Sequence, residues 1–378
     1  MKRLSIVQLF THSAVTRGGA VQGLLLARAL RDRGHRVICL FHAPFGQENK
    51  SVAAPSRHPC AIGLDIRWIN MRHPFSYARF RRWVRRERID VLHTHRSLAL
   101  LFAYFSTLGL DSPVLVANRS AVSAMTNPLV RHVFRSRRLG HLIAVAQAVK
   151  QDLINKERIF PDKISVVYGS FDEKRFTAGR DAHVMRAALR IEHSVPLVVC
   201  IAAVERRKGL DVLVQAARAV IRHLPSARFL VLGNIDDMGY YRALQADVKR
   251  FDLQERFLFL GHREDVPDIL AAADVAVSAS REEGLSGALR EALAMQKPVV
   301  CTAVGGNTEL IRDGESGWVV EAGNAPALSG ALLEALEDRA EASRRAENGR
   351  LMMRSYSNEV RCQRVEAIYF KLCQARNT

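Results

Sequence analysis

Short apolar stretches alternate with longer segments of helical periodicity along the first half of the chain. These stretches are rich in Val, Ile and Leu, which favours strands. The predicted strands cover residues 4–10, 37–42, 66–69, 91–93, 114–117, 141–145 and 164–167. Strands that alternate with helices indicate a parallel sheet, because the crossover between two parallel strands is usually a helix. The first half therefore predicts an α/β fold with helices on both faces of a sheet.

The same alternation starts again after a polar segment, residues 169–194. The predicted strands of the second half cover residues 197–203, 228–232, 257–260, 275–278, 299–302 and 318–320. Turn residues in the polar segment place a domain boundary there. The sequence predicts an N-terminal domain over residues 1–175, a C-terminal domain over 176–354 and a final helix over 355–378. We expect the ligand site between the two domains.

The composition agrees with two globular domains. A chain of 378 residues is longer than a single hydrophobic core usually grows, and 48% of its residues are apolar. Its six cysteines show no C-x-x-C spacing and follow no secretory segment, so we expect a reduced, cytoplasmic compartment. The longest apolar run, Leu98 to Leu110, is shorter than the ~20 residues that span a bilayer. We therefore expect no transmembrane helix.

The charge is unusual, because 56 Lys and Arg stand against 38 Asp and Glu and give a formal net charge of +18. Nucleic acid, an anionic membrane or a phosphorylated small molecule would each suit such a protein. The densest cluster, residues 79–88, places Phe80, Trp83 and Val84 on one helical face and arginines elsewhere. One interpretation is a helix on anionic lipid headgroups, with Phe80 and Trp83 at the interface. The other is a helix that covers the sheet and exposes a basic face to solvent.

Two segments of the N-terminal half carry candidate chemistry. Gly18 and Gly19 stand between the first strand and the first helix, where glycines let a ligand approach the N–H groups of a helix end. Their spacing to Gly23 differs from the dinucleotide fingerprint, and a plain turn would also explain them. His95 leaves a buried strand at the edge where α/β sheets bind ligands. It is either a substrate contact or a structural histidine, and its sequence neighbours offer no third metal ligand.

The second half offers cations after a predicted strand. Arg206, Arg207 and Lys208 follow the strand over 197–203, and Lys208 is placed to meet a phosphate group. Three consecutive cations could also form a solvated loop.

The most informative stretch runs from Ser278 to Val300, where a strand ends in a loop that contains Gly284 and opens a helix. Such a loop offers the N–H groups of Leu285 and Ser286 to a diphosphate, and the helix dipole helps.

Two glutamates frame the start of that helix. Glu283 lies in the loop, and Glu291 lies eight residues later, two turns into the helix. One carboxylate can therefore meet the transferred group while the other accepts hydrogen bonds from ribose hydroxyls. This division suits a nucleotide sugar, although two exposed glutamates on an ordinary helix would show the same spacing.

These motifs together resemble the large retaining glycosyltransferase family 4, which has the two-Rossmann-domain GT-B architecture. The resemblance rests on Glu283 to Glu291 and covers most of the chain. Further stretches that resemble the family are Gly18-Gly19, 90–95, 143–153, 166–176, Lys208-Gly209, 261–274 and 304–317.

The resemblance implies transfer with retention at the anomeric carbon, usually without a metal or another cofactor. The donor would bind mainly to the C-terminal domain and the acceptor to the N-terminal one. Glu291 would bind ribose, Glu283 the donor sugar hydroxyls and Lys208 the diphosphate, with backbone donors from Leu285 and Ser286. Cations and N–H groups would stabilise the departing diphosphate. The final helix would cross back onto the N-terminal domain.

The sequence departs from the family pattern in three ways. Ala202 and Ala203 stand where an arginine is common, so Arg206 or Arg207 would have to supply the second phosphate cation. Arg119 stands where many members have a histidine, and it is a candidate for holding a phosphate or an acceptor charge. A second glycine is missing after Gly233.

The sequence predicts a glycosyltransferase that uses a nucleotide-diphosphate sugar. The basic charge favours a lipid-linked, lipopolysaccharide or cell-surface glycan acceptor and a peripheral position on a membrane through residues 79–88. The alternative is a sugar-nucleotide epimerase or a glycan phosphorylase on the same fold. A nucleic-acid binder is disfavoured, because no zinc finger, RNP motif or aromatic interleaving accompanies the charge.

Overall fold

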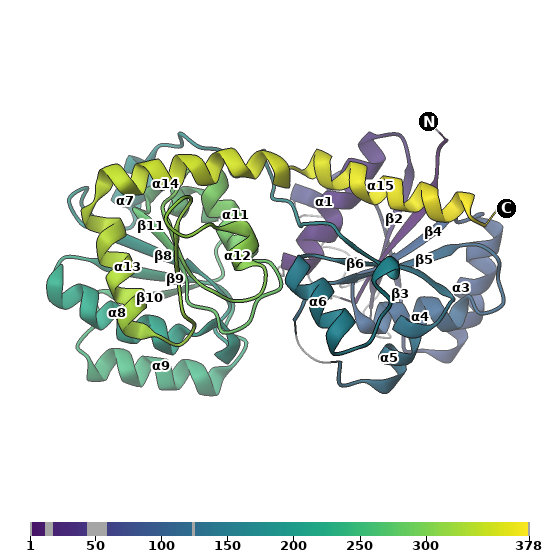
Figure 1. Ribbon diagram of the computed structural model, residues 1–378, viewed down its shortest axis with the longest axis horizontal. Coiled ribbons are helices and arrows are strands. Elements are labelled where there is room, and N and C mark those ends of the chain that lie inside the picture. Colours follow the sequence, from purple (N-terminus) through teal and green to yellow (C-terminus); the bar gives the residue numbers. More distant parts are fainter. Residues whose placement is uncertain (1, 12–17, 44–58, 123–124, 377–378) are drawn as a thin grey trace. The chain divides into compact units, whose positions relative to one another are not determined.

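The computed structural model describes residues 2–11, 18–43, 59–122 and 125–376. The chain forms two compact units, which are described separately (Figure 1). Unit 1 comprises residues 1–170 and 356–378, and unit 2 comprises residues 171–355. Both are parallel α/β folds, as predicted.

Unit 1 is built on a seven-stranded parallel sheet with the order β3-β2-β1-β4-β5-β6-β7. Its strands are β1 (Ser5–Phe10), β2 (Arg36–His42), β3 (Asp65–Ile69), β4 (Val91–Thr94), β5 (Val114–Arg119), β6 (Leu139–Ala144) and β7 (Ile164–Val166). Its described helices are α1 (Gly18–Asp32), α3 (Pro74–Arg86), α4 (Ser97–Ser106), α5 (Pro128–Arg135), α6 (Gln147–Asn155) and α15 (Asn358–Gln374).

Unit 2 contains a six-stranded parallel sheet with the order β10-β9-β8-β11-β12-β13. Its strands are β8 (Leu197–Ile201), β9 (Arg228–Leu232), β10 (Phe257–Gly261), β11 (Val275–Ser278), β12 (Val299–Thr302) and β13 (Trp318–Val320). Its helices are α7 (Ala182–Ala188), α8 (Leu210–His223), α9 (Met238–Arg250), α10 (Val266–Ala272), α11 (Gly287–Ala294), α12 (Asn307–Leu310), α13 (Ala325–Glu337) and α14 (Arg339–Met352).

Each predicted strand segment overlaps an observed strand. The boundary between the units differs from the prediction, because it falls after Ser170 and not after residue 175. Residues 171–175 pack within unit 2, where the Arg175 guanidinium donates to the Glu264 carbonyl at 2.9 Å. Phe171 is also buried.

The final helix α15 packs along α1 in unit 1 (Figure 1). Cys362, Val365 and Tyr369 of α15 belong to the same core as the strands. A polar clamp adds to this packing, because Glu366 accepts from Arg33 at 2.8 Å and contacts His35 Nε2 at 2.7 Å. The last segment of the chain is therefore part of the N-terminal sheet unit.

Helix α3 contains most of the basic cluster, and its apolar side faces the core of unit 1. Phe80 is 1% exposed and packs on Phe102 of α4 with ring centroids 4.9 Å apart, and Val84 is also buried. The interpretation that placed Phe80 at a lipid interface is therefore wrong, because the ring is already covered by protein. A covering helix with a basic face exposed to solvent agrees with this packing. The two interpretations are not exclusive, and a membrane role of the exposed Arg79, Arg82 and Arg85 stays a prediction.

Candidate active site

Both sheets reverse their strand order next to a central strand, and ligands of α/β proteins bind at the carboxyl ends of the strands at such points. In unit 1 the reversal lies between β1 and β4, and in unit 2 between β8 and β11. Lys208 follows β8 and Glu283 follows β11. The fold therefore brings these two candidates to one edge of the unit 2 sheet.

The loops after β8 and β11 are in direct contact. The Arg281 N–H donates to the Arg207 carbonyl at 2.8 Å. Gly209, which follows Lys208, has a φ of +62°, and a Cβ placed there would lie 2.0 Å from the Ala279 carbonyl oxygen. Only glycine combines this backbone conformation with so close an approach. The Lys208-Gly209 pair thus fixes the lysine beside the second loop.

Lys208 and Glu283 form an ion pair in which the lysine ammonium donates to Glu283 Oε1. The Ser280 hydroxyl donates to the same oxygen at 3.0 Å. The lysine side chain is 15% exposed and the glutamate side chain 9% exposed, so the pair is largely shielded from water. A cation and a carboxylate are thereby held together at the ligand edge, where an incoming phosphate or hydroxyl can compete for either partner.

The loop that opens α11 presents backbone donors beside this pair. The Ser286 hydroxyl caps the helix by accepting from the Leu289 N–H at 3.4 Å, and the Gly284 carbonyl accepts from the Gly306 N–H at 2.9 Å. In the described chain, no hydrogen bond uses the N–H of Leu285 or Ser286. Donors at a helix N-terminus suit an anion, and their role in binding a diphosphate stays a prediction.

Glu291 lies within α11, and its surroundings differ from those of Glu283. It is partly buried, and no described group hydrogen-bonds to its carboxylate. Burial raises the pKa of Glu291 to about 7, although the nearby Arg290 and Arg175 oppose the rise. The Glu291 carboxyl group therefore changes its charge near neutral pH.

The unit 1 candidates are placed differently. Gly18 and Gly19 are the first two residues of α1, and both are exposed. The residues before them lie outside the described part of the chain. Arg119 ends β5 and is partly buried, and burial lowers the pKa of its guanidinium against the opposing charges of Asp152 and Glu157.

His95 is 8% exposed, and both of its ring nitrogens already have partners. Nε2 lies 2.6 Å from Gln8 Oε1, and Nδ1 lies 3.0 Å from Asn118 Nδ2. The ring stacks on Phe10 with centroids 4.6 Å apart. The structural interpretation of His95 therefore fits better than a direct substrate contact, because neither nitrogen is open to a ligand.

Comparison with known proteins assigns the family. A model described as Glycosyltransferase Family 4 matches residues 16–175, and a model described as Glycosyl transferases group 1 matches residues 195–338. Between them they contain every candidate residue of both units. The chain belongs to glycosyltransferase family 4.

Relatives and solved structures agree with this assignment. An N-acetyl-alpha-D-glucosaminyl L-malate synthase of Bacillus anthracis is 25% identical over 85% of this chain and 85% of its own. A lipopolysaccharide core biosynthesis mannosyltransferase of Rhizobium meliloti is 28% identical over 55% of this chain and 61% of its own. Anabaena HepE in complex with UDP matches with a TM-score of 0.81 at 19% identity, over 96% of this chain and 99% of that one. The last match shows the GT-B fold.

In this glycosyltransferase, the side chains of Arg206 and Arg207 contact groups other than Lys208 and Glu283. The Arg206 guanidinium lies 5.3 Å from the centre of the Tyr240 ring, and Arg207 pairs with Glu205 at 2.5 Å. Both arginines line a cavity of about 470 Å³, together with Asp211, Tyr240, Arg281 and Glu282. The expectation that one of them supplies a second phosphate cation stays a prediction.

Some residues of the glycosyltransferase site were missed in the sequence. Ser280 contacts Glu283, and the Thr302 hydroxyl donates to the Ser280 carbonyl at 2.6 Å. In unit 1, Gln8 contacts His95, and its one signal is a polar residue inside an otherwise apolar strand. No group of His, Cys, Asp and Glu among the described residues could hold a metal ion.

Proposed function

We propose that the enzyme transfers a sugar from a nucleotide-diphosphate sugar to a hydroxyl group, with retention at the anomeric carbon and without a metal. The observation that carries the proposal is the Lys208 and Glu283 pair at the switch point of unit 2. Glu291 would bind the ribose hydroxyls, and the donor sugar would lie against Glu283. Lys208 and the N–H groups of Leu285 and Ser286 would bind the diphosphate.

The chemistry asks little of the protein beyond charge stabilisation. The bond between the anomeric carbon and the diphosphate oxygen breaks, and the acceptor oxygen bonds to that carbon on the same face. The acceptor hydroxyl gives its proton to the departing diphosphate. The Lys208 ammonium would leave Glu283 and pair with the negative charge that develops on the departing phosphate. Such electrostatic stabilisation is usually the largest single contribution to the lowering of the activation barrier.

We propose a lipid-linked, lipopolysaccharide or cell-surface glycan as the acceptor. The lipopolysaccharide mannosyltransferase of Rhizobium meliloti supports this class. The charge supports it too, because unit 1 holds 31 Lys and Arg against 11 Asp and Glu, whereas unit 2 holds 25 against 27. The positive charge of the enzyme thus resides in unit 1, the unit expected to bind the acceptor.

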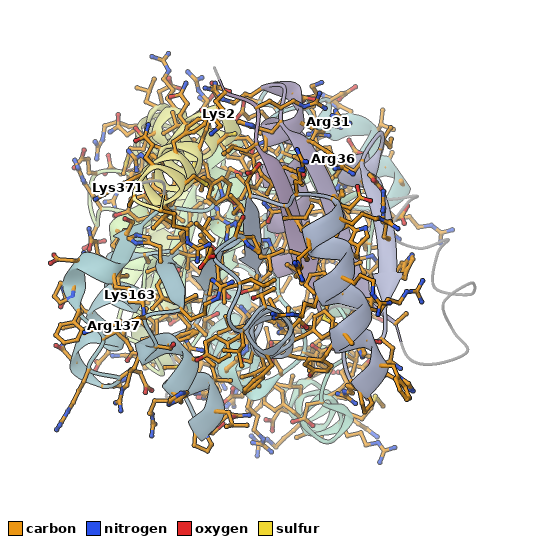
Figure 2. The ribbon with its side chains drawn as sticks, turned by 90° about the vertical axis from the view of Figure 1, so that its right-hand side faces the viewer. Lys2, Arg31, Arg36, Arg137, Lys163 and Lys371 are labelled. Carbon is orange, nitrogen blue, oxygen red and sulfur yellow. The ribbon has the colours of Figure 1, made fainter. Side chains whose placement is uncertain are left out.

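The cations of unit 1 are spread over its surface. Arg79, Arg82 and Arg85 are exposed on α3. Figure 2 shows six further cations on the face turned to the viewer, which are Lys2, Arg31, Arg36, Arg137, Lys163 and Lys371. A positive unit of this kind would be attracted to anionic lipids at the cytoplasmic face of a membrane. No helix among the described residues is long and apolar enough to span a bilayer.

Calorimetric titration with a panel of nucleosides and nucleoside diphosphates tests the donor site. We expect one nucleobase series to bind, and the diphosphate to bind more tightly than the nucleoside. Lys208→Gln should weaken the diphosphate by about 10- to 100-fold, because a hydrogen bond to a charged group contributes roughly 1.5–3 kcal/mol, and it should leave the nucleoside unchanged. Lys249→Gln is the matched control, because Lys249 is an exposed lysine in the last turn of α9. Equal losses in both variants would contradict the assignment of Lys208.

A further inference from the structure

The chain passes between the two units at two places, after Ser170 and after Ser355. On the unit 1 side, the first connection ends at Ser170 and the second begins at Tyr356, and both of these residues are buried. The Tyr356 ring packs on the ring of Tyr168 with centroids 5.2 Å apart. The two connections are therefore held firmly where they meet unit 1.

The side chain of Gln22 holds the first connection to α1. Its amide nitrogen donates to the Ser170 carbonyl at 2.6 Å, and its amide oxygen accepts from the Ser170 N–H at 2.9 Å. One side chain thus binds both polar groups of the Ser170 backbone. Such a contact at two points fixes the direction of the chain as well as its position.

The first residues of α15 hold the second connection to the same part of α1. Asn358 Nδ2 donates to the Leu25 carbonyl at 3.0 Å, and Asn358 Oδ1 accepts from the Ser170 hydroxyl at 3.1 Å. The buried Arg361 donates to the Gln22 carbonyl at 2.7 Å and to Gln22 Oε1 at 3.2 Å. Gln22, Ser170, Asn358 and Arg361 therefore form one polar anchor that joins both connections.

Beyond the anchor, the second connection interrupts a run of helix. The 3₁₀-helix η4 (Met353–Tyr356) lies between α14 and α15. A short 3₁₀ stretch between α-helical segments often marks a hinge, because its hydrogen bonds have poorer geometry. Arg354 and Ser355 of η4 are exposed, and the boundary between the units follows Ser355. The chain can therefore bend in η4 with little loss of packing.

We propose that Gln22 is a positioning residue, whose side chain fixes the point at which both connections leave unit 1. Motion between the units is thereby confined to η4 and to the bonds that follow Ser170. The inference rests on the proposed function in one respect, because the acceptor on unit 1 has to meet the donor on unit 2. A fixed pivot limits the arrangements that the two substrates can sample, which favours the reactive one.

Hydrogen exchange tests the anchor locally. Gln22→Met removes the acceptor of the Ser170 N–H with little change in side-chain volume. We expect the Ser170 amide to exchange about 10-fold faster in this variant, as suits the loss of one or two hydrogen bonds. Gln363→Met is the matched control, because Gln363 hydrogen-bonds to Glu359 of its own helix. Unchanged exchange of the Ser170 amide in Gln22→Met would overturn the anchor.

The distance between two spin labels tests the pivot. Gln151 of unit 1 and Arg242 of unit 2 are exposed, so Gln151→Cys and Arg242→Cys provide one labelling site on each unit. Cys373 is partly exposed and is replaced by Ser, whereas the other five cysteines are buried. Pulsed electron paramagnetic resonance then gives the distribution of distances between the labels.

The width of this distribution decides the positioning role. We expect a broader distribution in Gln22→Met than in the labelled parent protein, and an unchanged one in Gln363→Met. Asn358→Ala loosens the second connection and should also broaden the distribution, which keeps the test valid if Gln22→Met fails to fold. Equal widths in the parent and in both anchor variants, or equal broadening in the control, would overturn the proposal.

Nucleoside diphosphate binding separates this inference from the proposed function. The proposed donor residues belong to unit 2 and the anchor belongs to unit 1, so Gln22→Met should bind the nucleotide as tightly as the wild type. No nucleotide binding by the wild type would contradict the proposed function, while the distance distributions would still decide on the anchor. Weaker binding in Gln22→Met would show a disturbance beyond the pivot and would count against a positioning role.

Discussion

Two glutamates eight residues apart experience opposite environments in this enzyme. Glu283 is held by the Lys208 ammonium and the Ser280 hydroxyl, whereas Glu291 is partly buried and has no described hydrogen-bond donor. The spacing of the motif could be predicted from the sequence, and so could the approach of Lys208 to the site. The charge state of Glu291 could not, because desolvation depends on the packing around α11.

Glu291 makes the stability of the ligand-free enzyme depend on pH. Its pKa is about 7 in the folded state, against about 4.3 for an unperturbed glutamate, so between these values the folded state binds more protons than the unfolded state. Stability is therefore lost as the pH rises through this window. Glu291→Gln removes the effect, and we expect its melting temperature to match the wild type at pH 4 and to exceed it at pH 8. A difference in melting temperature between Glu291→Gln and the wild type that stays constant from pH 4 to pH 8 would contradict the raised pKa.

The helix α3 shows what an amphipathic pattern can and cannot predict. The spacing of Phe80 and Val84 predicted an apolar face correctly, but the same spacing serves a protein core and a lipid interface. The apolar face of α3 belongs to the protein core because Phe80 packs on Phe102 of α4, a residue distant in the sequence. The exposed arginines of α3 are still available to an anionic surface.

Binding of the enzyme to vesicles tests the membrane part of the proposal. Arg79, Arg82 and Arg85 are exposed on α3, and we expect their joint replacement by Gln to weaken binding to anionic vesicles about 100-fold at low salt, at roughly 1 kcal/mol per cation. High salt should weaken the wild type in the same way. The matched control replaces Arg222, Arg242 and Lys249, three exposed cations of unit 2. Similar losses in both triple variants, or no loss in either, would count against a membrane surface on α3.

At the scale of the whole molecule, the fold was accessible from the sequence because buried parallel strands are short apolar runs that stand out between helices. The hydrogen bond between the Gln8 amide and the Tyr369 hydroxyl in unit 1 was not accessible, since these residues are 361 positions apart and meet only when α15 packs on the sheet. The contacts of the Arg206 and Arg207 side chains could not be predicted from the sequence either, because they include Tyr240 of α9. Motifs thus revealed the site, and packing decided which neighbours complete it.

The most direct test of the central claim is the configuration of the sugar that the enzyme releases. The nucleotide sugar that binds in the calorimetric panel is incubated with the enzyme and with water as the acceptor, and proton NMR follows the first released anomer. We predict the same anomeric configuration as in the donor, formed at a rate that falls in Lys208→Gln. An inverted sugar, or release that does not depend on Lys208, would contradict retaining transfer at this site.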